Sequence, residues 1–244
     1  MRSFQSKSAD TLHKREFGPP RWGHRPGGGV ASARVSYSVK EIYRTLQGEG
    51  ANTGRAAVLC RFAGCNLWTG RETDRPSAIC RFCDTDFFGT DGPGGGKFPT
   101  AETLASQIAK TWGADRQSRL VICTGGEPLL QLDEALIGAL HAHEFQIAVE
   151  TNGTLESPVG IDWLCVSPKA GAPLRLRAGD ELKLVFPQEG LDPKDLAGLA
   201  FDHFFLQPMD GPDLRENQKM ATQYCIQHPP WRLSLQTHKV VGIP

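Results

Sequence analysis

Short apolar runs alternate with longer amphipathic segments along most of this chain, from about residue 35 onward. The runs have the length of buried β-strands, and they predict seven strands, at 56–62, 119–126, 146–151, 162–168, 181–187, 203–208 and 232–238. Apolar residues at helical spacing predict helices at 100–112, 132–143 and 214–228, with Thr100 as a candidate N-cap. Strands that alternate with helices are typical of parallel βαβ units. The sequence therefore predicts an α/β fold, either an open doubly wound sheet or a curved, partial TIM-like β/α barrel, with the strand count favouring the barrel.

Polar side chains follow nearly every predicted strand, and in parallel α/β folds the active site lies at the carboxyl ends of the strands. Each of them taken singly is an ordinary loop residue, but together they favour an enzyme. They are Cys65, Thr124, Glu127, Glu150, Thr151, Asn152, Ser167, Lys169, Gln207, Asp210, Thr237 and His238.

Residues 1–34 differ from the rest of the chain because they contain few aliphatic side chains, seven Lys or Arg and two Asp or Glu. Such a composition cannot bury enough apolar surface to fold. We interpret 1–34 as a disordered basic tail and 35–244 as one catalytic domain. A start site assigned too far upstream is an equally simple reading of the tail, and a targeting or RNA-contact role is a weaker one.

Charge and composition exclude several classes of function. The chain has 27 basic and 27 acidic residues, so nothing favours a nucleic-acid partner for the whole protein. No apolar run approaches the ~20 residues of a membrane span, and the first residues lack the apolar region of a signal peptide. Seven cysteines without a secretion signal favour free thiols or metal ligands over disulfides. We expect a cytoplasmic protein.

Three cysteines, Cys65, Cys80 and Cys83, form a C-x14-C-x2-C pattern with four possible readings. A structural zinc site would need a fourth ligand from far away. Unrelated core thiols fit poorly with the polar "RFCDTD" context, and a disulfide-exchange CxxC would normally open a helix. An iron–sulfur cluster on three thiolates would leave one iron open to a small molecule. Cys60, Cys123, Cys165 and Cys225 lie in apolar strands or a helix, and we assign these four to the core.

The segment "CTGGEPLLQ" (123–131) ends the second predicted strand with two glycines, which let a ligand approach the backbone closely. Together with the three-cysteine loop it resembles the radical S-adenosylmethionine (SAM) enzymes, although their usual spacing is C-x3-C-x2-C. Further motifs resemble the 7-carboxy-7-deazaguanine synthase family, in the subgroup with C-x14-C-x2-C spacing. They are "YRTLQGEG" (43–50), "CRFAGCNLW" (60–68), "CRFCDTD" (80–86), "ETNG" (150–153), "SPK" (167–169), "QPMDGP" (207–212) and "QTHKVVGIP" (236–244). The resemblance covers about 35–244.

The resemblance implies a homodimer with a trimmed β/α barrel, a [4Fe-4S] cluster, SAM and Mg²⁺. The family contracts the ring of 6-carboxy-5,6,7,8-tetrahydropterin, with loss of ammonia, to give 7-carboxy-7-deazaguanine for 7-deazapurines such as queuosine. An electron from the cluster cleaves SAM to a 5′-deoxyadenosyl radical, and we expect SAM to be regenerated. This chemistry belongs to the cofactor, which the protein orients and shields from water.

The resemblance also implies roles for individual residues. The cluster ligands would be Cys65, Cys80 and Cys83, with Thr85 on magnesium. The cofactor-binding residues would be Asp84, Gly125, Gly126, Glu127, Ser167, Pro168, Lys169, Gln207, Pro208, Met209 and Asp210. The substrate-binding residues would be Leu46, Gln47, Gly48, Glu49, Arg61, Thr124, His238 and the terminal carboxylate of Pro244, with Glu49 included as our own inference.

Some of these roles also have a physical reason in the residues themselves. Gln47 and Glu49 offer an amide and a carboxylate that can match the donor and acceptor edge of a pterin, and Arg61 can pair bidentately with a carboxylated substrate. We name no general base. The residues 66–79 between Cys65 and Cys80 would leave the cluster and return, with Trp68 as a packing anchor. We expect a flavodoxin or ferredoxin as electron donor, and neither a nucleic acid nor a membrane as a direct partner.

Two alternatives remain open at this point. A radical SAM enzyme with another substrate, such as an activator of a glycyl radical enzyme, would share the cluster loop and the glycine pair. A zinc-stabilised RNA-binding module would use the basic tail as its arm and would bind RNA in a salt-dependent manner.

Overall fold

A single nine-stranded sheet organises the described part of the chain, which in this computed structural model is residues 36–244. The tail predicted at 1–34 lies outside the described residues. All seven predicted strands are present, and each pairs in parallel with its neighbour. They are β2 (Ala56–Phe62), β4 (Leu120–Gly125), β5 (Gln146–Thr151), β6 (Trp163–Val166), β7 (Ala178–Phe186), β8 (Ala200–Pro208) and β9 (Trp231–Leu233).

Two further strands extend the sheet at one edge, and sequence patterning missed both. The strand β1 (Tyr37–Leu46) pairs antiparallel with β2, and the short β3 (Gly96–Phe98) pairs antiparallel with β1. The full strand order is β3-β1-β2-β4-β5-β6-β7-β8-β9. β1 escaped detection because its register shifts between Val39 and Glu41, which breaks the alternation of apolar and polar residues.

The three predicted helices are α1 (Ala101–Trp112), α2 (Glu134–Ala142) and α4 (Leu214–Gln227). Thr100 caps α1, since its side chain accepts from the Thr103 amide and the Thr103 side chain returns a bond to the Thr100 amide. Two short helices were not predicted, α3 (Pro193–Leu196) and α5 (Thr237–Val241). The prediction of a last strand over 232–238 was wrong at its end, because β9 stops at Leu233 and Thr237 and His238 begin α5.

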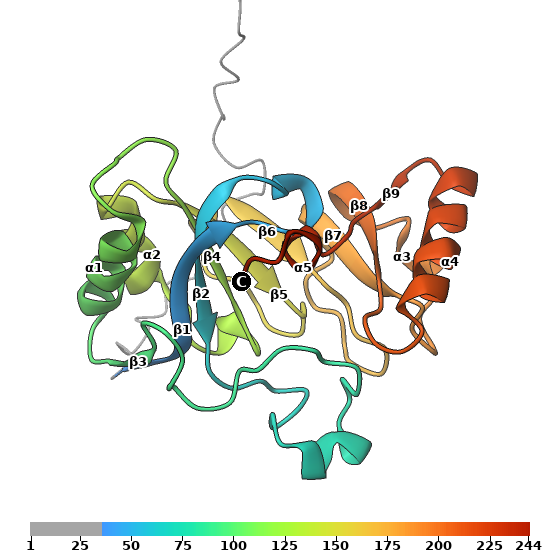
Figure 1. Cartoon of the computed structure of the whole chain (residues 1–244), viewed down its shortest axis with the longest axis horizontal. Helices are drawn as coiled ribbons and strands as arrows, with labels where there is room; N and C mark the ends of the chain where they lie inside the picture. Colours follow the sequence, from blue (N-terminus) through green and yellow to red (C-terminus); the bar gives the residue numbers. More distant parts are fainter. Residues whose placement is uncertain (1–35) are drawn as a thin grey trace, which may run out of the picture.

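The helices cover the outer face of the sheet only near its two ends (Figure 1). On one side α1 and α2 pack over β1, β2, β4 and β5, and on the other α3 and α4 pack over β7, β8 and β9. The crossovers from β5 to β6 and from β6 to β7 contain no helix. The sheet is therefore a trimmed barrel, open where a complete barrel would have further helices and strands.

The core cysteines are confirmed in part. Cys60, Cys123 and Cys165 are buried in the strands, whereas Cys225 is only half-buried on α4, where it packs at the edge of the core. That correction follows from the position of α4, which packs over the last strands at the edge of the sheet. Within residues 36–244, no helix has the length and apolar character needed to cross a bilayer.

Candidate active site

A cavity of about 440 Å³ opens at the carboxyl ends of the parallel strands and takes in nearly every predicted site residue. The rest of the wall comes from β1, the segment that follows it, α5, and the loop 80–87, which carries Cys80 and Cys83 and which we call the cluster loop. The predicted residues that line it are Leu46, Gln47, Gly48, Glu49, Arg61, Cys65, Cys80, Cys83, Asp84, Thr85, Thr124, Gly125, Gly126, Ser167, Lys169, Gln207, Pro208, Met209, Asp210, His238 and Pro244. Glu127 and Pro168 lie behind this wall.

The three thiols of the C-x14-C-x2-C pattern share this cavity. The Cys80 thiol donates to Cys83, which lowers the pKa of Cys83 to about 6 and raises that of Cys80, while burial raises the pKa of Cys65. Among the described residues, no three His, Cys, Asp or Glu side chains are close enough together to hold one metal ion. A four-iron cluster binds each cysteine through a different iron, so three thiols spread around one cavity suit a cluster better than a single zinc.

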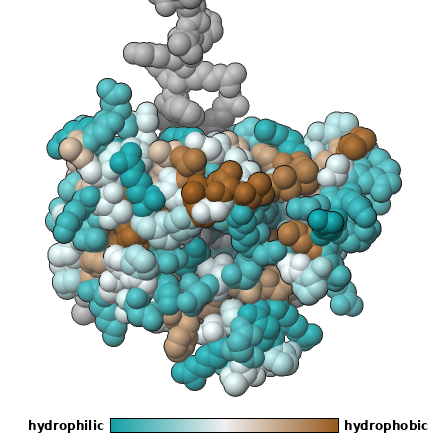
Figure 2. All heavy atoms as spheres, in the orientation of Figure 1, coloured by the Kyte–Doolittle hydropathy of each residue, from teal (hydrophilic) through white to brown (hydrophobic). Residues whose placement is uncertain are grey.

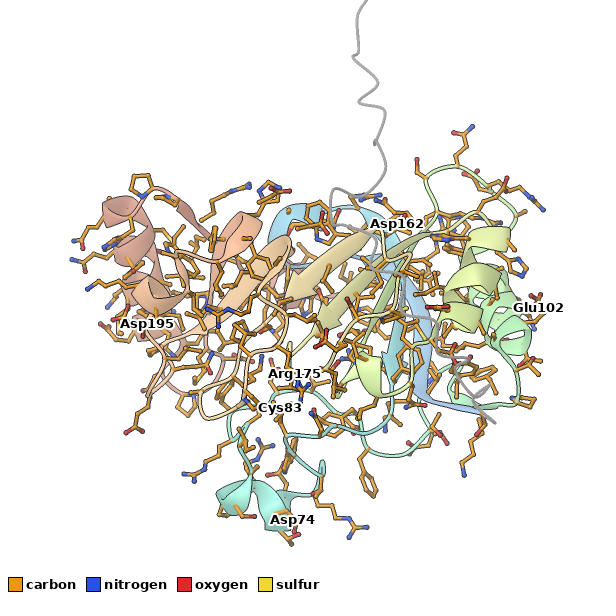
Figure 3. All side chains as sticks on the ribbon, turned by 180° about the vertical axis from the view of Figure 1, so that it is seen from behind. Asp74, Cys83, Glu102, Asp162, Arg175 and Asp195 are labelled. Carbon is orange, nitrogen blue, oxygen red and sulfur yellow. The ribbon has the colours of Figure 1, made fainter. Side chains whose placement is uncertain are left out.

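The insertion between Cys65 and Cys80 packs against itself and the cluster loop. Trp68 is buried and meets Phe87 edge to face at 5.4 Å between ring centroids, as expected of a packing anchor. The Arg75 guanidinium lies 4.0 Å over the Trp68 ring and donates to the carbonyl oxygens of Arg81 at 2.8 Å and Cys83 at 3.0 Å. Figure 3 shows Cys83 between the insertion, with Asp74 at its tip, and the edge of the sheet.

The glycine pair at the end of β4 lies directly against the backbone of neighbouring segments of the chain. A Cβ atom added to Gly126 would lie 2.2 Å from the Gly64 carbonyl oxygen and 2.8 Å from Cys65 Cβ, so only glycine fits beside that thiol. Glu127 is fully buried and accepts from the Leu129 and Asn152 amides and the Thr151 hydroxyl. Its carboxylate fastens the end of β4 to the end of β5.

The wall formed by β6 and β8 contains an unpaired acceptor. Gln207 is buried, and its Oε1 is one of two buried side-chain polar atoms in the described residues without a hydrogen-bond partner. An orphaned acceptor in a cavity wall is available to a ligand. Nearby, the Lys169 ammonium donates to the Ser167 carbonyl and hydroxyl oxygens at 2.6 and 2.7 Å, and burial lowers its pKa.

The mouth of the cavity carries a second charged group. Lys239 on α5 donates to Asp84 at 2.8 Å and to Asp210 at 2.6 Å, and Gln236 donates to Asp84 at 3.1 Å. Burial would raise the pKa of Asp84, but Lys239 and Gln236 together hold it below its ordinary value. Lys239 therefore links α5 to both the cluster loop and the segment after β8.

The opposite wall carries an amide and two carboxylates. Gln47 donates from Nε2 to Glu150 at 2.9 Å, while its Oε1 accepts from the Glu49 amide at 3.2 Å. Thr124 also donates to Glu150, at 3.2 Å. A buried lysine on β7, Lys183, pairs with Glu49 at 2.5 Å and with Glu150 at 3.2 Å.

Arg61 already has a partner from the strand that sequence analysis missed. Its Nε donates to Glu41 at 2.7 Å, and this bond, with Tyr43, raises the arginine pKa despite burial. His238 lies directly against the backbone of Gly48, where an added Cβ would be 2.0 Å from the ring nitrogen Nδ1. The Thr45 hydroxyl donates to the backbone oxygen of Pro244 at 2.7 Å, which holds this residue at the cavity.

Several cavity residues were absent from the predicted site, although most carried a signal. Lys183 is a charged residue inside an apolar strand, and Gln236 and Lys239 belong to the terminal motif. Glu150 had been placed at a strand end but given no role. Tyr43 opens the motif "YRTLQGEG" (43–50) but was given no role, and Glu41 had no usable signal, because it lies on a strand that was not recognised.

Curated proteins of known name resemble this chain along nearly their whole length. A 7-carboxy-7-deazaguanine synthase of Bordetella pertussis is 65% identical over 210 residues, which is 86% of this chain and 100% of that protein. The synthase of Caulobacter vibrioides is 62% identical, with the same coverage. The crystal structure of QueE from Escherichia coli matches with a TM-score of 0.62 at 26% identity, over 83% of this chain and 94% of that one. No family model matches the chain.

A trimmed β/α barrel with three thiols and a glycine pair at the carboxyl ends of its strands defines a radical SAM enzyme. The identity and full coverage of the relatives narrow this class to one family. The chain belongs to the 7-carboxy-7-deazaguanine synthase family.

Proposed function

We propose that this protein contracts the ring of 6-carboxy-5,6,7,8-tetrahydropterin, with loss of ammonia, to give 7-carboxy-7-deazaguanine. The observation that carries the proposal is a single cavity with a wall of sulfur and glycine on one side and a wall of carboxylates and an amide on the other. The first wall suits a cluster and its cofactor, and the second suits the donor and acceptor edge of a pterin. The alternative of a zinc-stabilised RNA-binding module lacks support, because no zinc cage forms among the described residues.

Cys65, Cys80 and Cys83 would hold a [4Fe-4S] cluster, which supplies the electron that turns SAM into a hydrogen-abstracting radical. SAM would lie along Gly125, Gly126 and the segments 167–169 and 207–210. The unpaired Oε1 of Gln207 fits this role, since a ligand donor would satisfy it. Glu127 would act from behind by fixing the strand ends that present the glycines.

The substrate would lie against Leu46, Gln47, Gly48 and Glu49, with Thr124 and His238 beside it. Arg61 and Pro244 line the same cavity, and a carboxylate on Pro244 would reach the substrate there. Thr85 would be the protein ligand of Mg²⁺, with substrate oxygens and waters completing the shell, because magnesium often keeps several waters. The metal would fix the substrate carboxylate and assist the rearrangement.

Two protein partners belong to this proposal. An exposed apolar patch, which we call the α5 patch, consists of Leu46, Leu233, Leu235, Val240 and Val241. Figure 2 shows apolar atoms gathered over α5 near the centre of this face, and we propose that a second copy of the chain covers them. A flavodoxin or ferredoxin would supply the electron from outside.

Anaerobic reconstitution and turnover test the proposal. The reconstituted protein should be brown, contain about four irons per chain, and convert 6-carboxytetrahydropterin when SAM, a reductant and Mg²⁺ are present. Omission of SAM or Mg²⁺ is the matched control and should abolish product. A colourless protein that carries zinc and yields no deazaguanine product would refute the proposal. A brown protein that cleaves SAM but leaves the pterin unchanged would point to another substrate.

A further inference from the structure

The cavity contains a buried lysine that none of the proposed binding roles uses. Lys183 lies in the middle of β7, and its side chain is only 6% exposed. Its neighbours in the strand, Leu182 and Leu184, are fully buried on the opposite face, so the alternation of the strand directs Lys183 into the barrel. A buried ammonium group is costly unless it is paired, so its partners define its role.

Those partners come from two segments that are far apart in the sequence. Glu49 follows β1, Glu150 ends β5, and Lys183 bonds both carboxylates, at 2.5 and 3.2 Å. Burial alone would lower the pKa of Lys183, but Glu150 and Glu49 raise it well above its ordinary value. The lysine therefore stays charged and spans the cavity wall between the two carboxylates.

The same contacts determine which way the Gln47 amide faces. Its Nε2 donates to Glu150 and its Oε1 accepts from the amide of Glu49, so both ends of the amide depend on residues that Lys183 holds. If the two carboxylates moved apart, the amide would lose its orientation. Gln47 and Glu49 are also residues that we assign to the pterin edge.

A third carboxylate beneath Lys183 supports the same segment from the barrel interior. Glu181 is buried and accepts from the Ala51 amide at 3.0 Å, directly after Glu49 and Gly50. A Cβ added to Gly50, where φ is 64°, would lie 2.0 Å from Glu181 Oε1. Gly50 thus allows the chain to press against Glu181, and this contact brings Glu49 within reach of Lys183.

We infer that Lys183 is a positioning residue, which ties Glu49, Glu150 and Gln47 into one rigid wall of acceptors for the N–H edge of the substrate. The inference rests on the proposed function and adds a residue to it. Lys183 itself acts through the carboxylates that it holds. Without the lysine, two carboxylates would share a buried wall with no cation between them, and one would take up a proton.

The direction of the pH effect follows from the charges around Glu150. Burial would raise the pKa of this carboxyl, but Lys183, Gln47 and Thr124 hold it below its ordinary value. Removing Lys183 raises that pKa, so the carboxylate that accepts from the substrate is lost at a higher pH. None of the other titratable groups nearby replaces the missing cation between the carboxylates of Glu49 and Glu150. The groups around Lys183 and Glu150 are Glu49, Glu181, Cys165, Lys169, Tyr43, Arg61 and Glu41.

Steady-state kinetics against pH with the reconstituted enzyme test the inference. Lys183→Met should raise KM for the tetrahydropterin by about tenfold or more and move the acid limb of kcat/KM to higher pH. Iron content and SAM binding should stay at the wild-type level. Lys183→Arg, which keeps the charge, should recover part of the affinity and the wild-type acid limb. Lys219→Met is the control, since it removes an exposed ion pair on α4 and should change nothing.

Lys183→Met leaves buried carboxylates unpaired and can fail to fold, so a double variant accompanies it. Lys183→Met with Glu150→Gln restores the net charge of the wild-type wall and should recover much of the melting temperature, but the KM should remain high. Thermal melting without any ligand separates this inference from the proposed function. The melting temperature of Lys183→Met should lie furthest below wild type near neutral pH and approach it as the pH falls and the carboxylates protonate.

The outcomes divide cleanly. If the wild-type enzyme leaves the pterin unchanged, the proposed function is refuted. If Lys183→Met nevertheless shows the pH-dependent loss of melting temperature, the positioning role of Lys183 stands. A wild-type enzyme that turns over, alongside a Lys183→Met variant with unchanged KM and pH profile, overturns the inference. A uniform loss of kcat with unchanged KM would also overturn it, because a positioning role for substrate acceptors acts on binding.

Discussion

At the scale of single residues, the site depends on positions where one atom more would collide with a neighbour. Gly126 faces the Gly64 carbonyl and Cys65, so its missing side chain sets the distance between the segment after β2 and the end of β4. Side chains with a less obvious role, such as Glu127, hold this arrangement from behind through bonds to β5. The residues that contact ligands and the residues that space them are therefore different.

Gly126→Ala should lower the affinity for SAM by about tenfold or more, a loss of about 1.4 kcal/mol or more. The new Cβ must displace the Gly64 carbonyl or Cys65, and overpacking of this kind also costs about 1–3 kcal/mol of stability. Equilibrium dialysis and thermal melting measure the two effects.

Gly138→Ala on α2 is the matched control, because an added Cβ there meets nothing within 4 Å. It should bind SAM normally and gain about 1 kcal/mol of stability, since alanine is the better helix former. Wild-type SAM affinity in Gly126→Ala would contradict the assignment of this glycine to the cofactor.

At the scale of elements, sequence patterning predicts the strands and helices that pack in the core, and it misses those whose side chains face the cavity. Most of the parallel strands and the helices α1 and α2 bury apolar side chains in the core, so the alternation of apolar runs predicted them. β1 was missed because Lys40, Glu41 and Tyr43 turn toward the cavity and a register shift disturbs its pattern. α5 was missed because none of its residues is buried in the chain.

The site residues also divide into those that sequence motifs predicted and those that depend on partners distant in the sequence. Motifs predicted the sulfur and glycine wall and most of the cavity lining, because those residues sit in recognisable strings. Lys183 could not be assigned, because its partners Glu49 and Glu150 are distant in sequence and only the sheet order brings them together. Arg61 was assigned to a ligand alone because its partner Glu41 lay on the unrecognised strand.

The insertion between Cys65 and Cys80 has a structural role, and this role requires its length. Six of its residues form the 3-10 helix η2 (Glu72–Ser77), which places Arg75 over Trp68 and against the carbonyls of Arg81 and Cys83. A shorter connection would lack these contacts. The insertion thus buttresses the loop that carries two of the three thiols.

Arg75→Met should loosen the cluster loop, because methionine can cover Trp68 but cannot donate to the two carbonyls. We expect iron to be lost several-fold faster to a chelator, with the melting temperature of the barrel nearly unchanged. Arg116→Met removes an exposed ion pair with Glu144 and should retain iron like wild type. Equal rates of iron loss in both variants would show that the insertion does not support the cluster.

At the scale of the whole molecule, the cavity is closed by segments from both edges of the sheet. β1 extends one edge, and the segment after β9 returns across the barrel, where the Thr237 amide donates to the Gly48 carbonyl oxygen at 3.0 Å. Lys239 then reaches both the cluster loop and the segment after β8. α5 therefore presents its polar side to the cavity and leaves Val240 and Val241 exposed on the outside, at 78% and 63%.

This arrangement predicts that dimerisation and the α5 patch depend on each other. Val240→Asp should convert the proposed dimer to a monomer at micromolar concentration, because burying an unpaired carboxylate in an apolar interface costs several kcal/mol and weakens association by about a hundredfold or more. Val159→Asp is the matched control, since Val159 is a similarly exposed valine in the loop between β5 and β6 and lies outside the patch. Sedimentation velocity distinguishes the two species.

A wild-type monomer, or a Val240→Asp variant that remains dimeric while folded, would show that the second copy binds elsewhere or not at all. The patch would then need another cover, because large apolar side chains gathered over α5 are exposed to water at a cost that an isolated chain has no reason to carry.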